Sequence, residues 1–465
     1  MHRSPAVRLL FCLIAASALG RAEPTVPSFE WVATGGGAKS DKTRGVNVDR
    51  DGNVYFTGEI AENGKPGDVS DGQFGDLTVK AVGAPDFVVG KLDAHGHYLW
   101  VRLLGGSLSD RGYGVAPDAE GNVYATGAFQ STDLVVNGAP LPNAGDYDIF
   151  VAKYDRDGNL LWIKTAGGKG YDYGHGIAVD AHGNAYVTGS VVGECAFGET
   201  RIPNDPGAHL FCAKYAPDGK LLWVKVSTGK AWSSGGNIAV DGAGNAIVAG
   251  SSSSVGALGG KPLHHPAPGS DSLLAKFTPE GEVAWISQGT GGSGVSLDAV
   301  AADADGGLWT CGVIKGSAVF GEETFTTAGG KNAFTLIQRY TPDGKLLWTR
   351  VGQSSGLALG LGVATDGRGH GYLTGEFTET LTLSGATLPS RGGVDVYVAS
   401  FNESGALDWI TQAGGKSVDS AYSIAWDPAG GLIIGGASAG PTDFGDQHAE
   451  KTNGVDLYVA RLRLK

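Results

Sequence analysis

Four aspartates stand at one position of a repeated pattern, where their carboxylates could together perform chemistry. The pattern contains an Asp-x-x-Gly hairpin motif, and eight residues before its Asp the chain carries Asp41, Asp110, Asp172 and Asp419. The other three copies have Ser233, Val295 and Ala358 at this position. Carboxylates that lie close together can bind a cation or supply the acid and base of glycosidic hydrolysis. These four residues, called the loop aspartates below, are therefore the first candidates for a site.

The motif that follows them is predicted to build turns. Its seven copies run from "VDRDGNVYFTG" at 48–58 to "WDPAGGLIIGG" at 426–436, and their turn aspartates are Asp49, Asp118, Asp180, Asp241, Asp303, Asp366 and Asp427. A calcium loop that begins in this way needs a bidentate acid at its twelfth position. Counted from Asp49, that position holds Ile60, which cannot chelate. Ca²⁺ therefore remains a hypothesis only for the loop aspartates Asp110 and Asp172.

Aromatic and ionisable residues accompany the loop aspartates and could stack against a sugar or a peptide. They lie on the least regular connections of the repeat, and binding residues tend to lie on such loops over a rigid scaffold. The candidate ligand-binding residues are Asp41, Asp110, Tyr113, Tyr171, Asp172, Tyr173, His175, Trp232, Asp298, Asp419 and Tyr422. The structural alternative is that the loop aspartates cap backbone amides at the start of a strand.

The remaining motifs give little support for a catalytic site. "GASAG" at 436–440 matches G-x-S-x-G around Ser438, but that nucleophile elbow needs a following helix, and here a loop to another strand is expected. His264 and His265 could bind a metal with a third ligand from elsewhere, although a proline-flanked pair in a loop is more often solvated. No catalytic residue is predicted.

A second motif, which ends in Trp, follows the first at a constant interval. With Trp31 included, the tryptophans at 31, 100, 162, 223, 285, 348 and 409 are 69, 62, 61, 62, 63 and 61 residues apart. Such a period indicates one supersecondary unit stacked on copies of itself. Repeats are predicted near 43–104, 105–166, 167–227, 228–289, 290–352, 353–413 and 414–465, the last completed by 28–34.

Turn residues divide each repeat into four antiparallel strands. In the third repeat these are 176–180, 184–189, 210–215 and 220–226, joined by Asp-x-x-Gly-Asn and Pro-Asp-Gly sequences that favour tight hairpins. The last repeat lacks its fourth strand, and residues 29–34 can supply it, which closes a ring. We therefore predict an all-β fold, a seven-bladed β-propeller of four-stranded antiparallel blades over 28–465, whose N-terminal strand completes the last blade. In that ring the loop aspartates would form one continuous arc.

The repeat resembles the bacterial β-propeller repeat called SBBP and, more distantly, NHL-type propellers. The resemblance rests on D-x-x-G-N-x-Y-x-T-G, then D-x-[FY]-V-A-K-[FY], then D-G-x-x-x-W, and it covers the chain from about residue 28. Repeats four to six depart most, for example in "NAIVAG", which lacks the Tyr. The resemblance implies a propeller in a family that is mostly exported and mostly without an assigned activity, so it names no substrate.

The first residues predict export. Arg3 and Arg8 precede an apolar run over 9–19, which is shorter than the ~20 residues of a spanning helix. Residues 1–22 are therefore predicted to be a cleaved signal peptide of a bacterial protein that is secreted, periplasmic or on the cell surface, without membrane insertion. Their loss removes three of 35 basic residues, so the net charge becomes 32 − 48 = −16, which disfavours nucleic acid.

Three cysteines remain, Cys195, Cys212 and Cys311, of which the first two could form a disulfide in an oxidising compartment. The sequence as a whole predicts a monomeric, noncatalytic scaffold that binds an unknown protein or carbohydrate with loops on one face. The alternative is a propeller hydrolase or lyase that acts on polysaccharide, with the loop aspartates in its central funnel.

Overall fold

The computed structural model describes residues 26–464 except 63, 66–67, 231, 254, 267–268, 292, 328–331 and 451–453. All regular secondary structure in this part of the chain is β-strand, so the all-β prediction is confirmed. None of the described residues form a helix with the length and apolar character of a membrane span. The predicted signal peptide at 1–22 lies outside the described residues.

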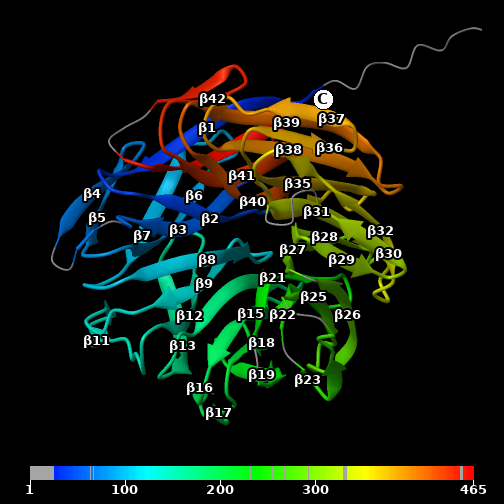
Figure 1. Ribbon diagram of the computed structural model, residues 1–465. Helices are drawn as coiled ribbons and strands as arrows, with labels where there is room; N and C mark the ends of the chain where they lie inside the picture. Colours follow the sequence, from blue (N-terminus) through cyan, green and yellow to red (C-terminus); the bar gives the residue numbers. More distant parts are fainter. Residues whose placement is uncertain are drawn as a thin grey trace, which may run out of the picture.

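Seven short strands surround a central axis (Figure 1). They are β2 (Lys42–Val48), β8 (Asp110–Pro117), β14 (Tyr173–Val179), β21 (Ser233–Val240), β27 (Val295–Ala302), β34 (Ala358–Thr365) and β40 (Asp419–Asp427). Each packs beside the next, and β40 packs beside β2, so the ring is closed.

Three further antiparallel strands extend outward from each of these innermost strands. The second strands are β3 (Val54–Ile60), β9 (Val123–Phe129), β15 (Ala185–Val192), β22 (Ala246–Ser252), β28 (Leu308–Lys315), β35 (His370–Phe377) and β41 (Gly431–Ser438). The third strands are β6 (Asp86–Leu92), β12 (Asp148–Tyr154), β18 (Ala208–Tyr215), β25 (Asp271–Phe277), β31 (Ala333–Tyr340), β38 (Asp395–Asn402) and β44 (Asp456–Arg463). The fourth strands are β7 (Tyr98–Leu104), β13 (Leu160–Gly168), β19 (Leu221–Val226), β26 (Val283–Gly291), β32 (Leu346–Val351), β39 (Leu407–Gly415) and β1 (Ser28–Gly36).

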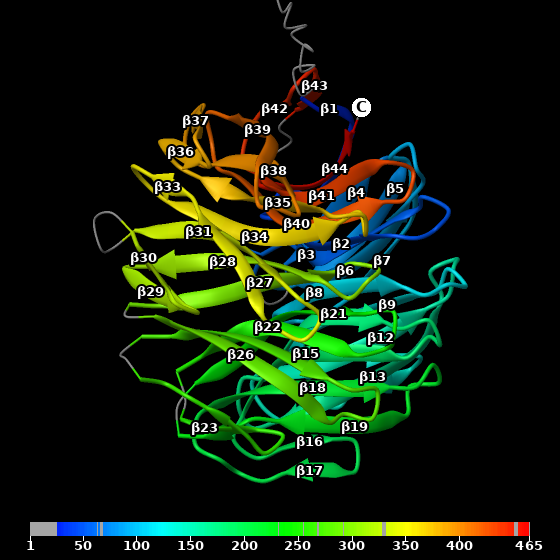
Figure 2. The same cartoon turned by 90° about the vertical axis from the view of Figure 1, so that its right-hand side faces the viewer.

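The N-terminal strand closes the fold as the sequence indicated. β1 pairs antiparallel with β44 over a register that runs from Ser28↔Arg463 to Gly35↔Leu457. In Figures 1 and 2 these two strands lie side by side although they come from opposite ends of the described chain.

The prediction of seven four-stranded blades is wrong, because each connection between a second and a third strand folds into a hairpin. The described residues form nine sheets of three or more strands and one two-stranded ribbon, and only three of the nine have four strands. Four hairpins extend the sheet of the preceding repeat to six strands: β4 (Val69–Phe74) with β5 (Leu77–Val82), β16 (Cys195–Phe197) with β17 (Thr200–Ile202), β29 (Ser317–Phe320) with β30 (Glu323–Thr326), and β42 (Thr442–Phe444) with β43 (Gln447–Ala449).

The remaining outer strands form separate small sheets. They are β20 (Thr228–Gly229) with β23 (Gly256–Leu258) and β24 (Lys261–Leu263), β33 (Gln353–Ser354) with β36 (Thr380–Leu383) and β37 (Ala386–Pro389), and the ribbon of β10 (Val135–Val136) and β11 (Ala139–Pro140). The outer hairpins lie at the periphery of the molecule (Figure 2). The four hairpins that extend a sheet to six strands pair with an edge that would otherwise present unsatisfied donors and acceptors.

The repeated tryptophan joins neighbouring repeats. The indole nitrogen of Trp100 donates to the carbonyl of Arg156 at 3.1 Å, in the turn of the next repeat. In that turn Gly158 has φ 79°, and a Cβ there would lie 2.7 Å from the Trp100 ring. The spacing of tryptophan and Asp-Gly turn in the sequence therefore reflects one contact made between successive repeats.

The turn aspartates cap turns, as predicted. Asp49 Oδ1 accepts the amides of Asp51 and Asn53, both at 2.9 Å, and most other copies repeat this arrangement. Five of them also pair with a cation of the third strand: Asp118 with Lys153, Asp180 with Lys214, Asp241 with Lys276, Asp303 with Arg339 and Asp427 with Arg461. The motif that occurs seven times is therefore structural.

Candidate functional site

The loop aspartates, which the sequence offered as candidate ligand-binding residues, are buried. Asp41 is 1% exposed, and Asp110, Asp172 and Asp419 are 0% exposed. Asp172 is typical, because its two carboxylate oxygens accept the amides of Gly168 at 2.8 Å and Val192 at 2.7 Å. These carboxylates fasten the loop before a first strand to the loop after the second strand. The four loop aspartates were predicted to bind a ligand, but in the structure they cap loops.

The hypothesis that Ca²⁺ binds at Asp110 and Asp172 is not supported, because their carboxylate oxygens already accept hydrogen bonds. Asp110 accepts four hydrogen bonds, from the amides of Gly106, Gln130 and Ser131 and from the Ser131 hydroxyl, so both of its oxygens are occupied. Both oxygens of Asp172 are occupied as well. In the described part of the chain no three His, Cys, Asp or Glu side chains gather into a possible metal site.

Burial makes the loop aspartates weaker acids. Burial raises the pKa of Asp41 to about 7 and the pKa values of Asp110 and Asp172 to about 6. The nearby carboxylate of Asp148 contributes to the raised pKa of Asp172. A protonated carboxyl carries no net charge, which lowers the cost of placing it in the interior.

A β-bulge occurs at the same place in every innermost strand. The pairing of β2 with β3 skips one residue between Thr43 and Gly45, and the other six first strands skip the equivalent residue. Bulges re-aim a side chain and are frequent next to functional sites. The skipped residues are Arg44, Tyr113, His175, Gly236, Asp298, Leu361 and Tyr422, and all seven line one central cavity of about 1200 Å³.

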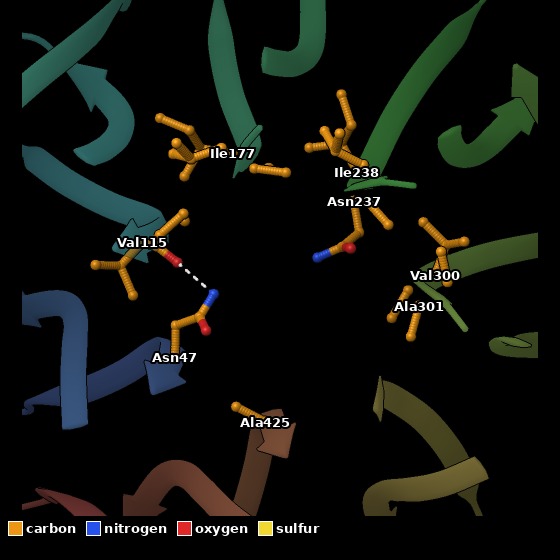
Figure 3. Close-up of a pocket in the computed structure, with 18 of the residues that line it drawn as sticks. Asn47, Val115, Ile177, Asn237, Ile238, Val300, Ala301 and Ala425 are labelled. Carbon is orange, nitrogen blue, oxygen red and sulfur yellow. Dashed lines mark hydrogen bonds between the residues drawn. The ribbon is translucent and has the colours of Figure 1, made fainter. Parts of the chain in front are cut away.

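The cavity wall combines apolar side chains with polar and charged ones. Figure 3 shows Val115, Ile177, Val300, Ala301 and Ala425 around the space. Asn47 and Asn237 come from different sides of the ring and point into it (Figure 3). The side-chain amide of Asn47 donates to the carbonyl of Val115 at 3.3 Å.

Arg44 is fixed at the mouth of this cavity. Its guanidinium donates two hydrogen bonds of 2.6 Å to Glu59, which is 0% exposed. It also lies against the rings of Tyr113 and Tyr422, with its carbon 5.4 and 5.7 Å from their centroids. The bidentate pair and the two rings hold the cation in one orientation.

Beside Arg44 the mouth has a continuous aromatic wall. The His175 ring lies 5.4 Å from Tyr113 and stacks on Tyr173 at 5.7 Å with an interplanar angle of 7°. Tyr173 stacks on Tyr147, which packs against Tyr171. Burial lowers the pKa of His175, and its Nδ1 lies 3.0 Å from the carbonyl of Gly235. The ring is therefore neutral, with the proton on Nδ1, and leaves Nε2 as an acceptor.

A second cavity of about 620 Å³ continues this wall outward. It shares His175, Trp232 and Ser234 with the central cavity. Its other lining residues are Tyr171, Tyr173, Ser190, Val192 and Ala208. Trp232 is 50% exposed and Tyr171 is 49% exposed, so two large aromatic side chains stand open to solvent at the edge of a pocket.

Asp298 is the acidic member of the bulge ring. Its side chain is half-buried and bonds to the Ser296 side chain, and burial raises its pKa to about 6. Among the described residues, no basic side chain forms an ion pair with it. The mouth thus combines Arg44, whose charge is paired with Glu59, the aromatic wall, and Asp298, which forms no ion pair among the described residues.

The sequence indicated most of the residues at the mouth of the cavity, but it placed the loop aspartates at the centre of the site. Tyr113, His175, Asp298 and Tyr422 line the central cavity, Tyr171 and Tyr173 line the outer one, and Trp232 lines both. The sequence missed Arg44, Asn47, Glu59, Tyr147 and Asn237. Arg44 could have been found by aligning the repeats, since it holds the position of Tyr113 and His175.

The other candidate side chains are engaged elsewhere. Ser438 is buried and its hydroxyl donates to the carbonyl of Gly440 at 2.7 Å. His265 Nδ1 lies 3.0 Å from Asp271 Oδ2. Cys195 and Cys212 are free and buried, so the disulfide left open by the sequence is not formed.

Comparison with known proteins identifies the repeat. The beta-propeller repeat family SBBP matches residues 99–128 and 161–190. An uncharacterized WD repeat-containing protein of Acanthamoeba polyphaga mimivirus is 25% identical over 155 residues, which are 31% of this chain and 11% of that protein. Regulatory protein FlaEY of Caulobacter vibrioides is 25% identical over 175 residues, 36% of this chain and 17% of that protein. The chain spans less than a fifth of the length of either relative.

Solved structures that are similar belong to varied proteins. A puromycin hydrolase mutant complexed with PGG matches with a TM-score of 0.42 and 11% identity, over 90% of this chain and 55% of that one. A mutant of NanB sialidase from Streptococcus pneumoniae matches with a TM-score of 0.37 and 11% identity, over 92% and 68% of the two chains. At such TM-scores these neighbours assign no activity to this chain.

Proposed function

From the premise that this chain carries SBBP β-propeller repeats, we propose that it is a noncatalytic binding protein which holds a saccharide at the aromatic mouth of its central cavity. The observation that carries the proposal is the wall of Tyr113, His175, Tyr173, Tyr147 and Tyr171, which ends at the exposed Trp232. Exposed aromatic groups at a concave site are uncommon on a monomer's surface and mark a binding surface.

The chemistry of this wall suits a sugar ring. The apolar C–H face of a pyranose can lie on an aromatic ring, while its hydroxyls need donors and acceptors around the edge. The pocket provides these in the hydroxyls of Ser190 and Ser234, the amide of Asn237 and Nε2 of His175. A peptide would use the same rings, so its binding is an outcome that the experiment must distinguish.

The alternative of a polysaccharide hydrolase or lyase assigned acid and base chemistry to the loop aspartates. Their oxygens are buried and accept hydrogen bonds from the loops, so they are not offered to a substrate in the cavity. The exported location and the monomeric state remain predictions.

The test is titration of the protein with neutral, amino and acidic oligosaccharides, with tryptophan fluorescence and calorimetry as readouts. Trp232→Ala and Tyr171→Ala should each weaken binding by about tenfold or more, because each removes a stacking surface. The matched control is Val418→Ala, since Val418 holds the same position of another repeat and is 49% exposed. Binding of peptides alone, or an equal loss in Val418→Ala, would overturn the proposal.

A further inference from the structure

One position of the bulge ring has no side chain. Six of the seven bulged residues carry one, and the exception is Gly236 on β21. A Cβ built on Gly236 would meet nothing closer than 3.4 Å, and its φ lies outside the left-handed region. By contrast, a Cβ on Gly45, one residue after the bulge of β2, would lie 2.8 Å from a backbone oxygen. Packing and backbone conformation therefore do not require glycine at 236, and its effect is to leave one position of the ring without a side chain, called the gap below.

The gap lies between two polar members of the ring. Going round the axis, β14 precedes β21 and β27 follows it, so His175 and Asp298 flank Gly236. The built Cβ of Gly236 would lie 3.6 Å from the Cα of Asp298. Trp232 and Ser234, which line both cavities, come from the same segment as Gly236. The gap thus joins the aromatic pocket to the side of the mouth where Asp298 stands.

The charge at this gap is not balanced within the mouth. The other charged member of the ring, Arg44, lies across the ring and is paired with Glu59 through two hydrogen bonds. Asp298 has the Ser296 side chain as its polar neighbour, and no ion pair to it occurs in the residues that the structure describes. A half-buried carboxyl group without a cation gains most from a ligand that brings one.

We infer that the saccharide held at this mouth carries a free amino group, and that the ammonium passes through the gap at Gly236 to meet Asp298 while the sugar ring rests on the aromatic wall. This inference rests on the proposed function and names its ligand class. The neutral His175 adds no positive charge that would repel the ammonium. The binding is noncovalent, and specificity comes from the pairing of one ammonium with one carboxylate.

The experiment compares two ligands that differ only at the nitrogen. A glucosamine oligosaccharide and the N-acetylglucosamine oligosaccharide of the same length are titrated into the full chain by calorimetry. The unacetylated oligosaccharide should bind about tenfold more tightly. Asp298→Asn should remove this preference and leave the weaker affinity for the acetylated oligosaccharide unchanged. The control for net charge is Glu199→Gln, which changes an exposed acid in the turn between β16 and β17.

Substitution of Gly236 by a residue with a side chain gives an independent test. Gly236→Leu places there the residue type that β34 carries at the same position, Leu361, so the fold should tolerate it. It should abolish binding of the amino sugar, whereas Gly236→Ala should retain it, and the melting temperature of each variant checks folding.

Two negative outcomes separate this inference from the function on which it rests. Equal affinity for the two oligosaccharides, or a preference that survives Asp298→Asn, would overturn the inference that an amino group of the ligand meets Asp298. It would leave the proposed saccharide binding in place. If no saccharide binding responds to Trp232→Ala or Tyr171→Ala, the proposed function fails as well.

Discussion

The two ends of the innermost strands hold buried aspartates that differ in one respect, the presence of a cation. At the turn end, Asp241 is 9% exposed and pairs with Lys276 at 2.8 Å. Although burial opposes ionisation, the hydrogen bonds from Lys276 and Asn245 hold the pKa of Asp241 below its usual value. At the loop end, Asp172 accepts two amides but has no cation, and burial raises its pKa to about 6. The pKa of Asp241 is thus lowered beside a cation, whereas the pKa of Asp172 is raised where no cation opposes burial.

The same two ends also differ in how closely the repeats agree. The turn end repeats its aspartate seven times and pairs it with Lys or Arg in five repeats. Beside the loop end, the bulged position changes between Arg, Tyr, His, Gly, Asp and Leu. The turn aspartates, which are the same in all repeats, stabilise the sheets. The bulged residues, which differ between repeats, line the cavity.

Removal of a turn-end cation should have the largest effect on stability. Lys276→Met leaves Asp241 buried without its charge partner, which typically costs about 3–5 kcal/mol. The control is Lys225→Met, because Lys225 pairs with the exposed Glu282 at 3.4 Å and such pairs contribute about 1 kcal/mol or less. Denaturant unfolding of both variants measures the difference. Equal losses would show that the turn-end pair is not specially stabilising.

The loop aspartates should make the protein less stable as the pH rises. Their folded pKa values, about 7 for Asp41 and about 6 for Asp110 and Asp172, lie above the value of 3.8 for a free carboxyl. Their stabilising contribution is therefore complete below about pH 4 and is lost as the pH passes through about 6 to 7. Unfolding at about pH 5 and about pH 8 should differ by on the order of 3 kcal/mol, with the lower pH more stable.

The turn-end carboxyls of Asp180 and Asp241 act in the opposite direction, which sharpens the comparison. Asp180 and Asp241 have lowered pKa values, so their contribution is present above the unfolded pKa and is lost as the pH falls through the folded one. Stability should therefore be greatest between these two ranges. Asp172→Asn should flatten the decline on the alkaline side, and a flat profile in the unchanged protein would contradict the raised pKa values of the loop aspartates.

Changes at bulged positions away from the aromatic wall should have the smallest effect. Leu361 lies half-buried in the central cavity on β34, and the equivalent residues of other repeats are Arg, Tyr, His, Gly and Asp. Leu361→Thr should alter the free energy of unfolding by less than about 1 kcal/mol. It should also leave saccharide affinity unchanged. A loss above about 2 kcal/mol in denaturant unfolding would show that bulged residues support the fold.

The amino-acid sequence by itself determined the parts of this protein that depend on residues close together in the chain. Asp-x-x-Gly and Asp-Gly turns and the tryptophan period predict antiparallel strands in equivalent repeats, because turn chemistry is local. The spare strand at residues 29–34 predicts the closure by β1 and β44. Seven of the eleven candidate ligand-binding residues also line the cavities, since they occupy equivalent loop and bulge positions.

Only the tertiary structure decided how these parts meet. Each outer hairpin pairs with a strand of another repeat or forms its own small sheet, so the strand count of a sheet cannot be obtained from one repeat. The loop aspartates are hidden because neighbouring loops close over them and donate amides, which changed four candidate ligands into structural caps. Arg44 and Glu59 are 15 residues apart and became a pair at the mouth because a bulge turned one side chain toward the cavity. Burial and side-chain direction depend on what packs from the next repeat, and that information is not local to any motif.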